Sequence, residues 1–253
     1  MSNAHDGAVA VVTGAGSGIG RASARRFAAD GAQVVVSDVD REGGAETVDL
    51  IEDAGGEATF VACDVTDQAD IDALFRETVE TYGPPDVAHN NAGIEGKTVP
   101  THEQSDEDWA SVIDVNLTGV WRCLKAEIAL MAEHGGGAIV NTSSIAGLSA
   151  GGPAPYVASK HGVVGLTRIT AVEYGDLGIR VNAVCPGVVD TPMIDRSSDA
   201  GFGDRLDAIV QTNPISRKAD PNEVADAVAW LASEEASYVT GHAMTVDGGF
   251  MSQ

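Results

Sequence analysis

The chain has 253 residues, of which 43% are hydrophobic and 21% are charged. This length and composition suit one large α/β domain with a buried core, and they exclude a chain that is disordered throughout. Asp and Glu number 38 against 15 Lys and Arg, which gives a formal net charge of −23. Because nucleic-acid binding depends on basic side chains that neutralise phosphates, this balance excludes sequence-wide DNA binding, and it disfavours an anionic membrane surface.

The acidic excess also has an unusual make-up, since 23 Asp and 15 Glu are accompanied by only 4 Lys. Many carboxylates with few lysines are typical of proteins from salt-loving organisms, in which salt screens the repulsion between like charges. An ordinary acidic cytosolic protein is the alternative interpretation. We favour the halophilic one.

The three cysteines, Cys63, Cys123 and Cys185, lie far apart in mostly apolar surroundings and show no CxxC spacing. This pattern predicts free, buried thiols in a reducing compartment. The N-terminus shows no basic region followed by an apolar run, so no signal peptide is expected. Residues 135–159 carry no charge, but their many Gly, Ser, Pro and Asn residues do not suit a membrane span. We therefore expect a cytoplasmic protein that does not insert into membranes.

Short apolar runs alternate with amphipathic stretches along the chain. The expected strands are Ala8–Thr13, Gln33–Asp38, Ala58–Cys63, Asp86–Asn90, Ala138–Ser143, Arg180–Cys185 and Ala243–Val246. The expected helices are Ile19–Ala29, Glu42–Ala54, Gln68–Tyr82, Asp106–His134, Ala154–Leu177 and Glu223–Ser233. This alternation, without a linker or repeat, predicts a single-domain α/β fold over residues 1–253. Its expected architecture is a doubly wound, Rossmann-type parallel sheet of about seven strands with helices on both faces.

The longest stretch without an expected element is Val188–Asn213, which follows the sixth strand. In a doubly wound sheet, ligands bind outside the carboxyl ends of the strands. We therefore predict that residues 188–213 form a substrate lid. Its apolar side chains predict a partly apolar lining: Met193, Ile194, Phe202 and Leu206.

A glycine-rich turn, Thr13–Gly20, joins the first expected strand to the first helix. Glycines let backbone N–H groups approach a pyrophosphate, and the helix N-terminus supplies partial positive charge. The spacing is Gly-x3-Gly-x-Gly, so a tight strand-to-helix connection is an alternative explanation. Asp38, at the end of the second strand, favours a dinucleotide site, because a carboxylate there accepts both ribose hydroxyls and repels a 2′-phosphate.

Three further patterns follow in chain order: Asn90-Asn91-Ala92-Gly93, Tyr156-x3-Lys160, and Pro186-Gly187 after the sixth strand. With 4 Tyr and 4 Lys in 253 residues, a Tyr-x3-Lys pair arises by chance only about 0.06 times. Together with the TGxxxGxG turn, these patterns resemble the short-chain dehydrogenase/reductase family. The resemblance runs from Val9 to Gly249.

Tyr156 and Lys160 are four residues apart, so on a helix they lie on the same face one turn apart. An ammonium beside a phenol favours the phenolate. Lowering a phenol pKa from about 10 towards 7 needs roughly 4 kcal/mol, which Lys160 and an oxidised nicotinamide could supply together. The resemblance implies that Tyr156 is the general acid/base and that Lys160 also bonds the nicotinamide ribose.

Ser144 resembles the family serine that holds the substrate oxygen. The interval from Ser144 to Tyr156 is one residue shorter than is usual in the family, so anchoring on the interval would select Ser143 instead. We prefer Ser144 because it follows a strand end in the SSIAG pattern. Asn116, inside the long helix, matches a family asparagine that helps relay protons through water to Lys160, and a buried structural Asn is the alternative.

The resemblance also implies NAD as the cofactor. Asp64 and Val65 resemble the pair that flanks adenine, Asn91 the residue at the adenosine ribose, and Val189 and Thr191 positions at the nicotinamide carboxamide. The expected cofactor-binding residues are Gly14, Ser17, Gly18, Ile19, Gly20, Asp38, Asp64, Val65, Asn91, Ala92, Gly93, Tyr156, Lys160, Pro186, Gly187, Val189 and Thr191.

NADP-preferring relatives usually carry a basic residue where this chain has Ser17 or Val39, and neither is charged. His89 departs from the apolar residue usual before the Asn-Asn pair, and we interpret it as a strand histidine satisfied by a neighbour. No histidine has metal-ligand spacing such as HExxH, so no metal site is expected.

These residues predict an NAD-dependent oxidoreductase that interconverts a small secondary alcohol and a ketone by hydride transfer. Two alternatives stay open: an NADP-linked ketoreductase, for example of 3-oxoacyl thioesters, and a catalytically idle family member that binds a dinucleotide as a scaffold. The intact tyrosine, lysine, asparagine and serine disfavour the idle form. The family resemblance further implies a homotetramer, because the two long helices and the C-terminal strands usually pair across two-fold axes.

Overall fold

The structure is a computed structural model of the chain, and it describes residues 4–197 and 203–253. Seven strands form one sheet in the order β3-β2-β1-β4-β5-β6-β7, with every neighbouring pair parallel. The strands are β1 (Val9–Thr13), β2 (Gln33–Asp38), β3 (Glu57–Ala62), β4 (Val87–Asn90), β5 (Gly137–Thr142), β6 (Ile179–Pro186) and β7 (Ala243–Val246). The chain order reverses between β1 and β4, which makes this a doubly wound sheet and confirms the predicted fold class.

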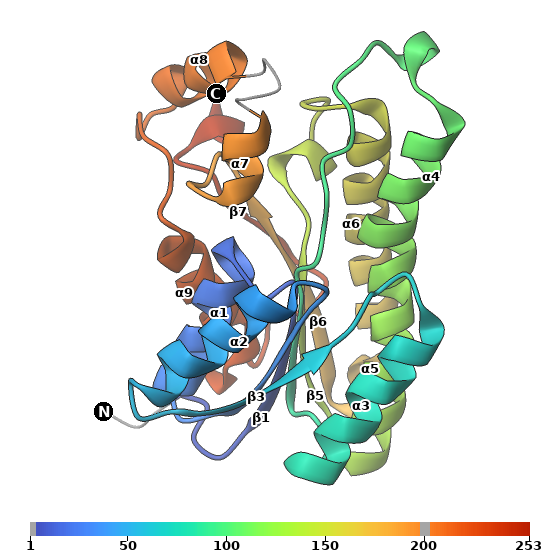
Figure 1. Ribbon diagram of the computed structural model, residues 1–253, viewed down its shortest axis with the longest axis vertical. Helices are drawn as coiled ribbons and strands as arrows, with labels where there is room; N and C mark the ends of the chain where they lie inside the picture. The colour runs from blue at the N-terminus through green and yellow to red at the C-terminus, as the bar shows by residue number, and fades with distance from the viewer. Residues whose placement is uncertain (1–3, 198–202) are drawn as a thin grey trace.

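Helices cover both faces of the sheet (Figure 1). One face carries α1 (Gly18–Ala29), α2 (Arg41–Glu52) and α9 (Pro221–Ala232). The other face carries α3 (Gln68–Thr81), α4 (Asp106–Ile113), α5 (Val120–His134) and α6 (Ala154–Tyr174). At the top of Figure 1, α7 (Pro192–Ser197) and α8 (Gly203–Thr212) lie together at one end of the molecule. The short helical turns are η1 (Thr101–Glu103), η2 (Asp114–Gly119), η3 (Ile145–Gly147), η4 (Gly175–Leu177), η6 (Glu234–Ala236) and η7 (Phe250–Ser252).

The central strands are mostly apolar because helices cover the sheet on both sides. All five residues of β1 are buried. On one face Phe27 and Val228 belong to the core between the sheet and α1 and α9. On the other, Leu124 packs with β5 and β6, and Leu74 with β1 and β2. The two layers hold the sheet rigid, so its carboxyl edge is a fixed platform for loops.

The predicted long helix Asp106–His134 is wrong as one continuous element, because residues Asp114–Gly119 form a π-helical turn between α4 and α5. Asn116 lies in this turn, and its side chain bonds the backbone of Ile94 outside the helix. A side chain that bonds another segment's backbone favours such a local departure from α-helical geometry.

The segment predicted as a lid contains helical structure, since α7 and α8 both fall within residues 188–213. The prediction that this segment lacks regular secondary structure is therefore wrong. Met193 and Ile194 line the cavity described below. Phe202 lies outside the described residues, as does the side chain of Leu206.

Cys63, Cys123 and Cys185 are buried and free, and burial is the largest cause that raises the pKa of each thiol. Within residues 4–197 and 203–253, no helix is both long and apolar enough to cross a bilayer. The same residues contain no cluster of three or more His, Cys, Asp or Glu side chains suited to a metal ion.

Candidate active site

A cavity of about 750 Å³ lies at the carboxyl edge of the sheet, where β1, β4, β5 and β6 end. This is the edge at which doubly wound sheets bind ligands, next to the point where the strand order reverses. The predicted site residues that line the cavity are Gly14, Ser17, Gly18, Ile19, Asp38, Asp64, Val65, Asn91, Ala92, Gly93, Ser144, Tyr156, Lys160, Pro186, Gly187, Val189 and Thr191. Gly20 and Asn116 do not line it, and both act behind its wall.

The glycine turn is packed too closely for side chains. Gly14 has φ +63°, and a Cβ there would lie 2.7 Å from Ala92 Cα. A Cβ at Gly20 would lie 2.1 Å from the Gly14 carbonyl oxygen. Asn91 holds the same turn from β4, because its amide donates to the carbonyl oxygens of Thr13 (3.2 Å) and Gly14 (3.1 Å). Gly20 thus lets α1 approach the turn, and the turn exposes backbone to the cavity.

Asp38 and Asp64 line the end of the cavity that lies away from Tyr156 and Lys160. Asp38 Oδ2 accepts from the Gly16 N–H at 2.8 Å, so the carboxylate at the end of β2 also fixes the glycine turn. Asp64 Oδ1 accepts from the backbone N–H and the hydroxyl of Thr66 at 2.9 and 2.8 Å. Each carboxylate still has lone pairs to offer, since a carboxylate accepts about four hydrogen bonds.

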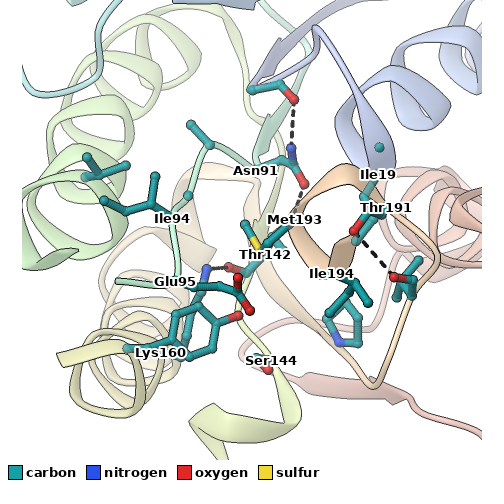
Figure 2. A pocket seen from close by; sticks show the side chains of 18 of the residues that line it. Ile19, Asn91, Ile94, Glu95, Thr142, Ser144, Lys160, Thr191, Met193 and Ile194 are labelled. Carbon is teal, nitrogen blue, oxygen red and sulfur yellow. Dashed lines mark hydrogen bonds between the residues drawn. The ribbon is translucent and has the colours of Figure 1, made fainter. Parts of the chain in front are cut away.

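Tyr156 and Lys160 project from α6, one helical turn apart, into the other end of the cavity. Lys160 Nζ lies 5.6 Å from the centre of the Tyr156 ring. It also donates to the Thr142 carbonyl oxygen at 2.9 Å, at the end of β5 (Figure 2). The two side chains therefore meet where β5 ends.

Burial shifts both groups towards their neutral forms. It lowers the pKa of Lys160 to about 8, and it raises the pKa of Tyr156 to about 12, against a hydrogen bond from Ser144 that lowers it. The sequence predicted a phenol favoured towards phenolate by Lys160. In the protein alone, burial is the largest cause acting on the phenol, and it favours the neutral form.

The two neighbouring serines have different partners. The Ser144 hydroxyl accepts from the Ala146 N–H at 3.1 Å, and its proximity lowers the pKa of the Tyr156 phenol. The Ser143 hydroxyl donates to the Lys160 carbonyl oxygen at 2.9 Å, in the backbone of α6. Both serines line the cavity, and of the two it is Ser144 that influences the pKa of the phenol. This geometry favours Ser144 as the serine beside the reacting atoms.

Asn116 holds the loop after β4 in place. Its Oδ1 accepts from the Ile94 N–H at 2.8 Å, and its Nδ2 donates to the Ile94 carbonyl oxygen at 2.8 Å. The amide also donates to the Ser159 hydroxyl at 3.2 Å, next to Lys160 on α6. The side chain thus ties β4's loop to α6, and the predicted proton relay through water stays a prediction.

His89 is fully buried behind the site, and burial lowers its pKa to about 3. Its Nε2 bonds the Thr142 hydroxyl at 2.8 Å. Thr142 also donates to Asn91 at 3.3 Å. The neutral histidine therefore supports, through Nε2, the strand end that presents Thr142 to Lys160, whereas its buried Nδ1 has no hydrogen-bond partner among the described residues.

Several residues that line the cavity were not predicted from the sequence, and Glu95 is the charged one nearest to Tyr156. Glu95 lines the cavity, and its charge raises the pKa of Tyr156. Figure 2 shows its side chain reaching into the same part of the cavity as Lys160 and Ser144. The available signal was its position, two residues after the Asn-Asn-Ala-Gly pattern at the carboxyl end of a strand.

Comparison with known proteins gives a consistent picture. A family model described as enoyl-(acyl carrier protein) reductase matches residues 14–251. The cyclohexanol dehydrogenase of Acinetobacter sp. (strain SE19) is 44% identical over 254 residues, which cover 100% of this chain and 98% of that protein. The cis-4-hydroxycyclohexanecarboxylate dehydrogenase of Sinomonas cyclohexanicum is 45% identical over 252 residues, or 99% of each chain. The crystal structure of levodione reductase matches with a TM-score of 0.94 at 39% identity, covering 96% of this chain and 97% of that one.

Proposed function

This chain belongs to the short-chain dehydrogenase/reductase family of oxidoreductases that act on CH–OH groups, and we propose that it interconverts a secondary alcohol and a ketone with NAD. The observation that carries this proposal is the Tyr156 phenol, which lies beside Lys160 and close enough to Ser144 for that hydroxyl to lower its pKa, in a cavity that also meets the glycine turn. The chain thus places an acid/base group and a dinucleotide-sized groove together.

The lining fits a nicotinamide dinucleotide. The turn at Gly14 offers backbone at the N-terminus of α1, where partial positive charge favours a pyrophosphate. Asp38 would hold the adenosine ribose hydroxyls, and the segment that includes Pro186, Val189 and Thr191 would hold the nicotinamide end. When bound, the nicotinamide supplies the hydride acceptor or donor, and its oxidised form supplies positive charge near Tyr156.

In oxidation, Tyr156 removes the hydroxyl proton of the alcohol as the carbon loses its hydride, and in reduction it returns that proton. Ser144 donates to the same substrate oxygen and so holds it against the phenol. Lys160 stabilises the phenolate while it carries its own proton. Because burial lowers its pKa to about 8, this help fades as the pH rises past that value.

A comparison of cofactors tests the NAD assignment. A 2′-phosphate near Asp38 would place like charges within a few ångströms, which costs about 1–4 kcal/mol and gives roughly a ten- to thousandfold preference for NAD. The measurement is the ratio of kcat/KM with NAD and with NADP. Asp38→Ala should raise the efficiency with NADP, and Asp38→Asn separates charge from the hydrogen bond to the Gly16 N–H. Equal efficiencies in the parent protein contradict the assignment.

A panel of secondary alcohols tests the activity itself. We expect NADH formation with at least one ring or chain alcohol, and the dehydrogenase named for cyclohexanol makes that ring alcohol the first choice. Tight NADH binding without turnover of any alcohol in the panel would favour the idle scaffold. Turnover with NADPH and 3-oxoacyl thioesters alone would favour the ketoreductase.

We extend the proposal to segment 188–213 and its role as a substrate lid. Met193 and Ile194 of α7 and Ile209 of α8 line the cavity, so this segment offers an apolar cover at the substrate end. Replacing Ile209 with Ala should raise KM for alcohols more than it changes NADH affinity. An equal change in both would argue against a lid.

We also propose a homotetramer. On the outer side of the α4, α5 and α6 layer, Trp109 is 43% exposed, Trp121 49% and Val172 80%. Large exposed apolar side chains on adjacent helices favour burial against a second copy. Light scattering in high salt should give the mass of four chains, and a monomer mass rejects this proposal.

The acidic surface and the free thiols support a cytoplasmic setting in a high-salt organism as a further part of the proposal. The net charge of −23 favours solubility when salt screens it. Fractionation of the source cells would locate the protein.

A further inference from the structure

His89 is a polar side chain at an apolar place in the sheet. In the strand register it lies between Val12 of β1 and Val140 of β5, and both valines belong to the core under α1 and α9. The histidine is fully buried, and its Nε2 lies 2.8 Å from the Thr142 hydroxyl oxygen. Among the described residues, Nδ1 has no hydrogen-bond partner. Any role of this side chain must therefore act through Thr142.

The neighbouring partners fix the direction of the bond between His89 and Thr142. Asn91 Nδ2 lies 3.2 Å from the Thr13 carbonyl oxygen and 3.1 Å from the Gly14 carbonyl oxygen, so the amide nitrogen donates to both. Asn91 Oδ1 consequently faces the Thr142 hydroxyl, at 3.3 Å, and accepts its only proton. The Thr142 oxygen is then left to accept, so His89 must carry its ring proton on Nε2 and donate it.

The same tautomer accounts for the unpartnered ring nitrogen. A neutral imidazole has one N–H donor and one acceptor nitrogen. With the proton on Nε2, the atom without a partner is a bare nitrogen. With the proton on Nδ1, a buried N–H would have no acceptor, and Thr142 would turn its proton to His89 and away from Asn91. Burial, which lowers the pKa of His89 to about 3, keeps the ring neutral.

These bonds run from the buried histidine to both ends of the cavity. Asn91 Nδ2 sits against the start of α1, since a Cβ at Gly20 would lie 2.6 Å from it. The Thr142 carbonyl oxygen accepts from Lys160 Nζ at 2.9 Å (Figure 2). Thr142 is therefore the junction at which the hydroxyl faces the glycine turn and the carbonyl faces the lysine.

We infer that His89 is a positioning residue for the dinucleotide turn: it donates from Nε2 to Thr142 and so holds the Asn91 amide against the Gly14 carbonyl. His89 itself does not line the cavity. The inference rests on the proposed function, since the turn that it positions is the one proposed to bind the dinucleotide. Without a donor at His89, the Thr142 hydroxyl is free to rotate, and the Asn91 amide loses its fixed orientation.

Two substitutions at His89 test this role. His89→Leu removes the donor at similar volume. His89→Gln restores one, because its Nε2 is as many bonds from the backbone as the histidine Nε2. In His89→Leu we expect the dissociation constant for NADH to rise at least about threefold, the effect of one lost hydrogen bond. In His89→Gln it should return to within about twofold of the parent value.

His5 provides the matched control. It is also buried, its Nε2 bonds the Ala229 carbonyl oxygen at 3.1 Å, and it does not line the cavity. His5→Leu removes a buried histidine bond of the same kind, so it should lower the melting temperature and keep the NADH affinity of the parent. A loss of NADH affinity in His5→Leu equal to that in His89→Leu overturns the inference.

A double-mutant cycle separates positioning from a general loss of packing. Thr142→Val removes the hydroxyl through which His89 is inferred to act. Adding His89→Leu to Thr142→Val should leave the NADH dissociation constant within about twofold of that of Thr142→Val alone, because effects that pass through one group do not add. Independent structural losses would instead multiply, and that result contradicts the inference.

The ring proton can be measured directly by NMR in protein labelled with ¹⁵N in its 6 histidines. The His89 signals, identified by their loss in either variant, should show a protonated Nε2 and a bare Nδ1 from about pH 8 to about pH 5. A parent protein that binds neither NADH nor NADPH defeats the proposed function, yet the ring proton still tests His89. A protonated Nδ1, unchanged NADH affinity in His89→Leu, or no recovery in His89→Gln overturns the inference.

Discussion

Tyr156 and Lys160 face a cavity at the carboxyl edge of the sheet, whereas Glu127 of α5 is enclosed between that helix and the sheet. Asn90 donates to Glu127 Oε2 at 3.0 Å, and the same amide donates to Asn141 Oδ1 at 3.0 Å. Asn141 in turn donates to the Thr167 hydroxyl of α6 at 3.0 Å. We call Glu127, Asn90, Asn141 and Thr167 the buried polar row.

The two regions have the same cause of perturbed protonation. Burial raises the pKa of Glu127 to about 8, as it raises that of Tyr156 and lowers that of Lys160. In the polar row, however, the donors and acceptors are protein groups on α5, α6 and two strands. At the candidate active site, by contrast, Tyr156 and Lys160 face a cavity that has room for a ligand. A shifted pKa therefore marks burial, and access to a cavity decides whether the group can do chemistry.

The largest expected effect is at the tyrosine. Tyr156→Phe removes the proton carrier and should lower kcat at least about a hundredfold, while NADH affinity stays nearly intact. Lys160→Ala should impair both, because it removes the charge beside the phenol and a group at the nicotinamide ribose. Steady-state kinetics and NADH fluorescence titration check the pair. Normal turnover in the Phe variant would mean that another group moves the proton.

Substitution of the two neighbouring serines should give smaller effects, and these effects should differ in kind. Ser144→Ala should lower kcat about tenfold or more with little change in stability, because its hydroxyl bonds the phenol. Ser143→Ala should instead destabilise the protein by about 1 kcal/mol, the usual value of a hydrogen bond lost to a backbone carbonyl. Kinetics and denaturant melts of both variants give the answer, and a reversed pattern would assign the substrate to Ser143.

A substitution in the buried polar row should change the stability of the protein and leave its kcat unchanged. A carboxyl group whose folded pKa lies above its unfolded value stabilises the fold below the unfolded pKa, near 4.5, and this stability is lost as pH rises through about 8. Glu127→Gln should therefore lose less stability than the parent between pH 5 and 8, by on the order of a few kcal/mol. Urea melts across that range measure it.

The exposed Glu133 on the same helix offers the matched control. Glu133→Gln should keep the pH dependence of the parent. Both variants should retain kcat, and a large loss of kcat in Glu127→Gln would join the polar row to catalysis.

The smallest expected effect concerns the charged surface of the protein, which belongs neither to the candidate active site nor to the buried polar row. Moving from low to molar salt should raise the melting temperature, because screening relieves the repulsion of 23 excess negative charges. For a chain of this size, 1 kcal/mol corresponds to about 2–4 °C. Thermal melts over the salt range check it, and a flat or falling curve removes the halophilic interpretation.

Most of the fold follows from local pattern. The strands β1, β2 and β6 could be predicted from the sequence because each contains a run rich in valine and other apolar residues, as buried parallel strands do. The Tyr156–Lys160 pair could also be placed, since both residues lie on one helix face. These features depend on residues close together in the chain.

The rest depends on contacts between distant segments. The π-helical turn at Asn116 carries an amide that bonds Ile94, 22 residues earlier in the chain. The loop that carries Glu95 forms part of the cavity wall only because it is held beside α6. Nothing in the local sequence distinguishes Glu127 from a solvated glutamate on a helix, because its burial against Asn90 depends on the packing of α5 on β4.

The three buried cysteines have a practical consequence for watching the molecule move. The thiolate is the form that reacts with alkylating reagents, and burial suppresses it at Cys63, Cys123 and Cys185. Labelling must then wait for a local opening that admits the reagent. Cys185 lies beside Ser144 at the end of β6, whereas Cys63 and Cys123 share the core under α3 and α5. The labelling rate of each thiol consequently reports how often its own part of the protein opens.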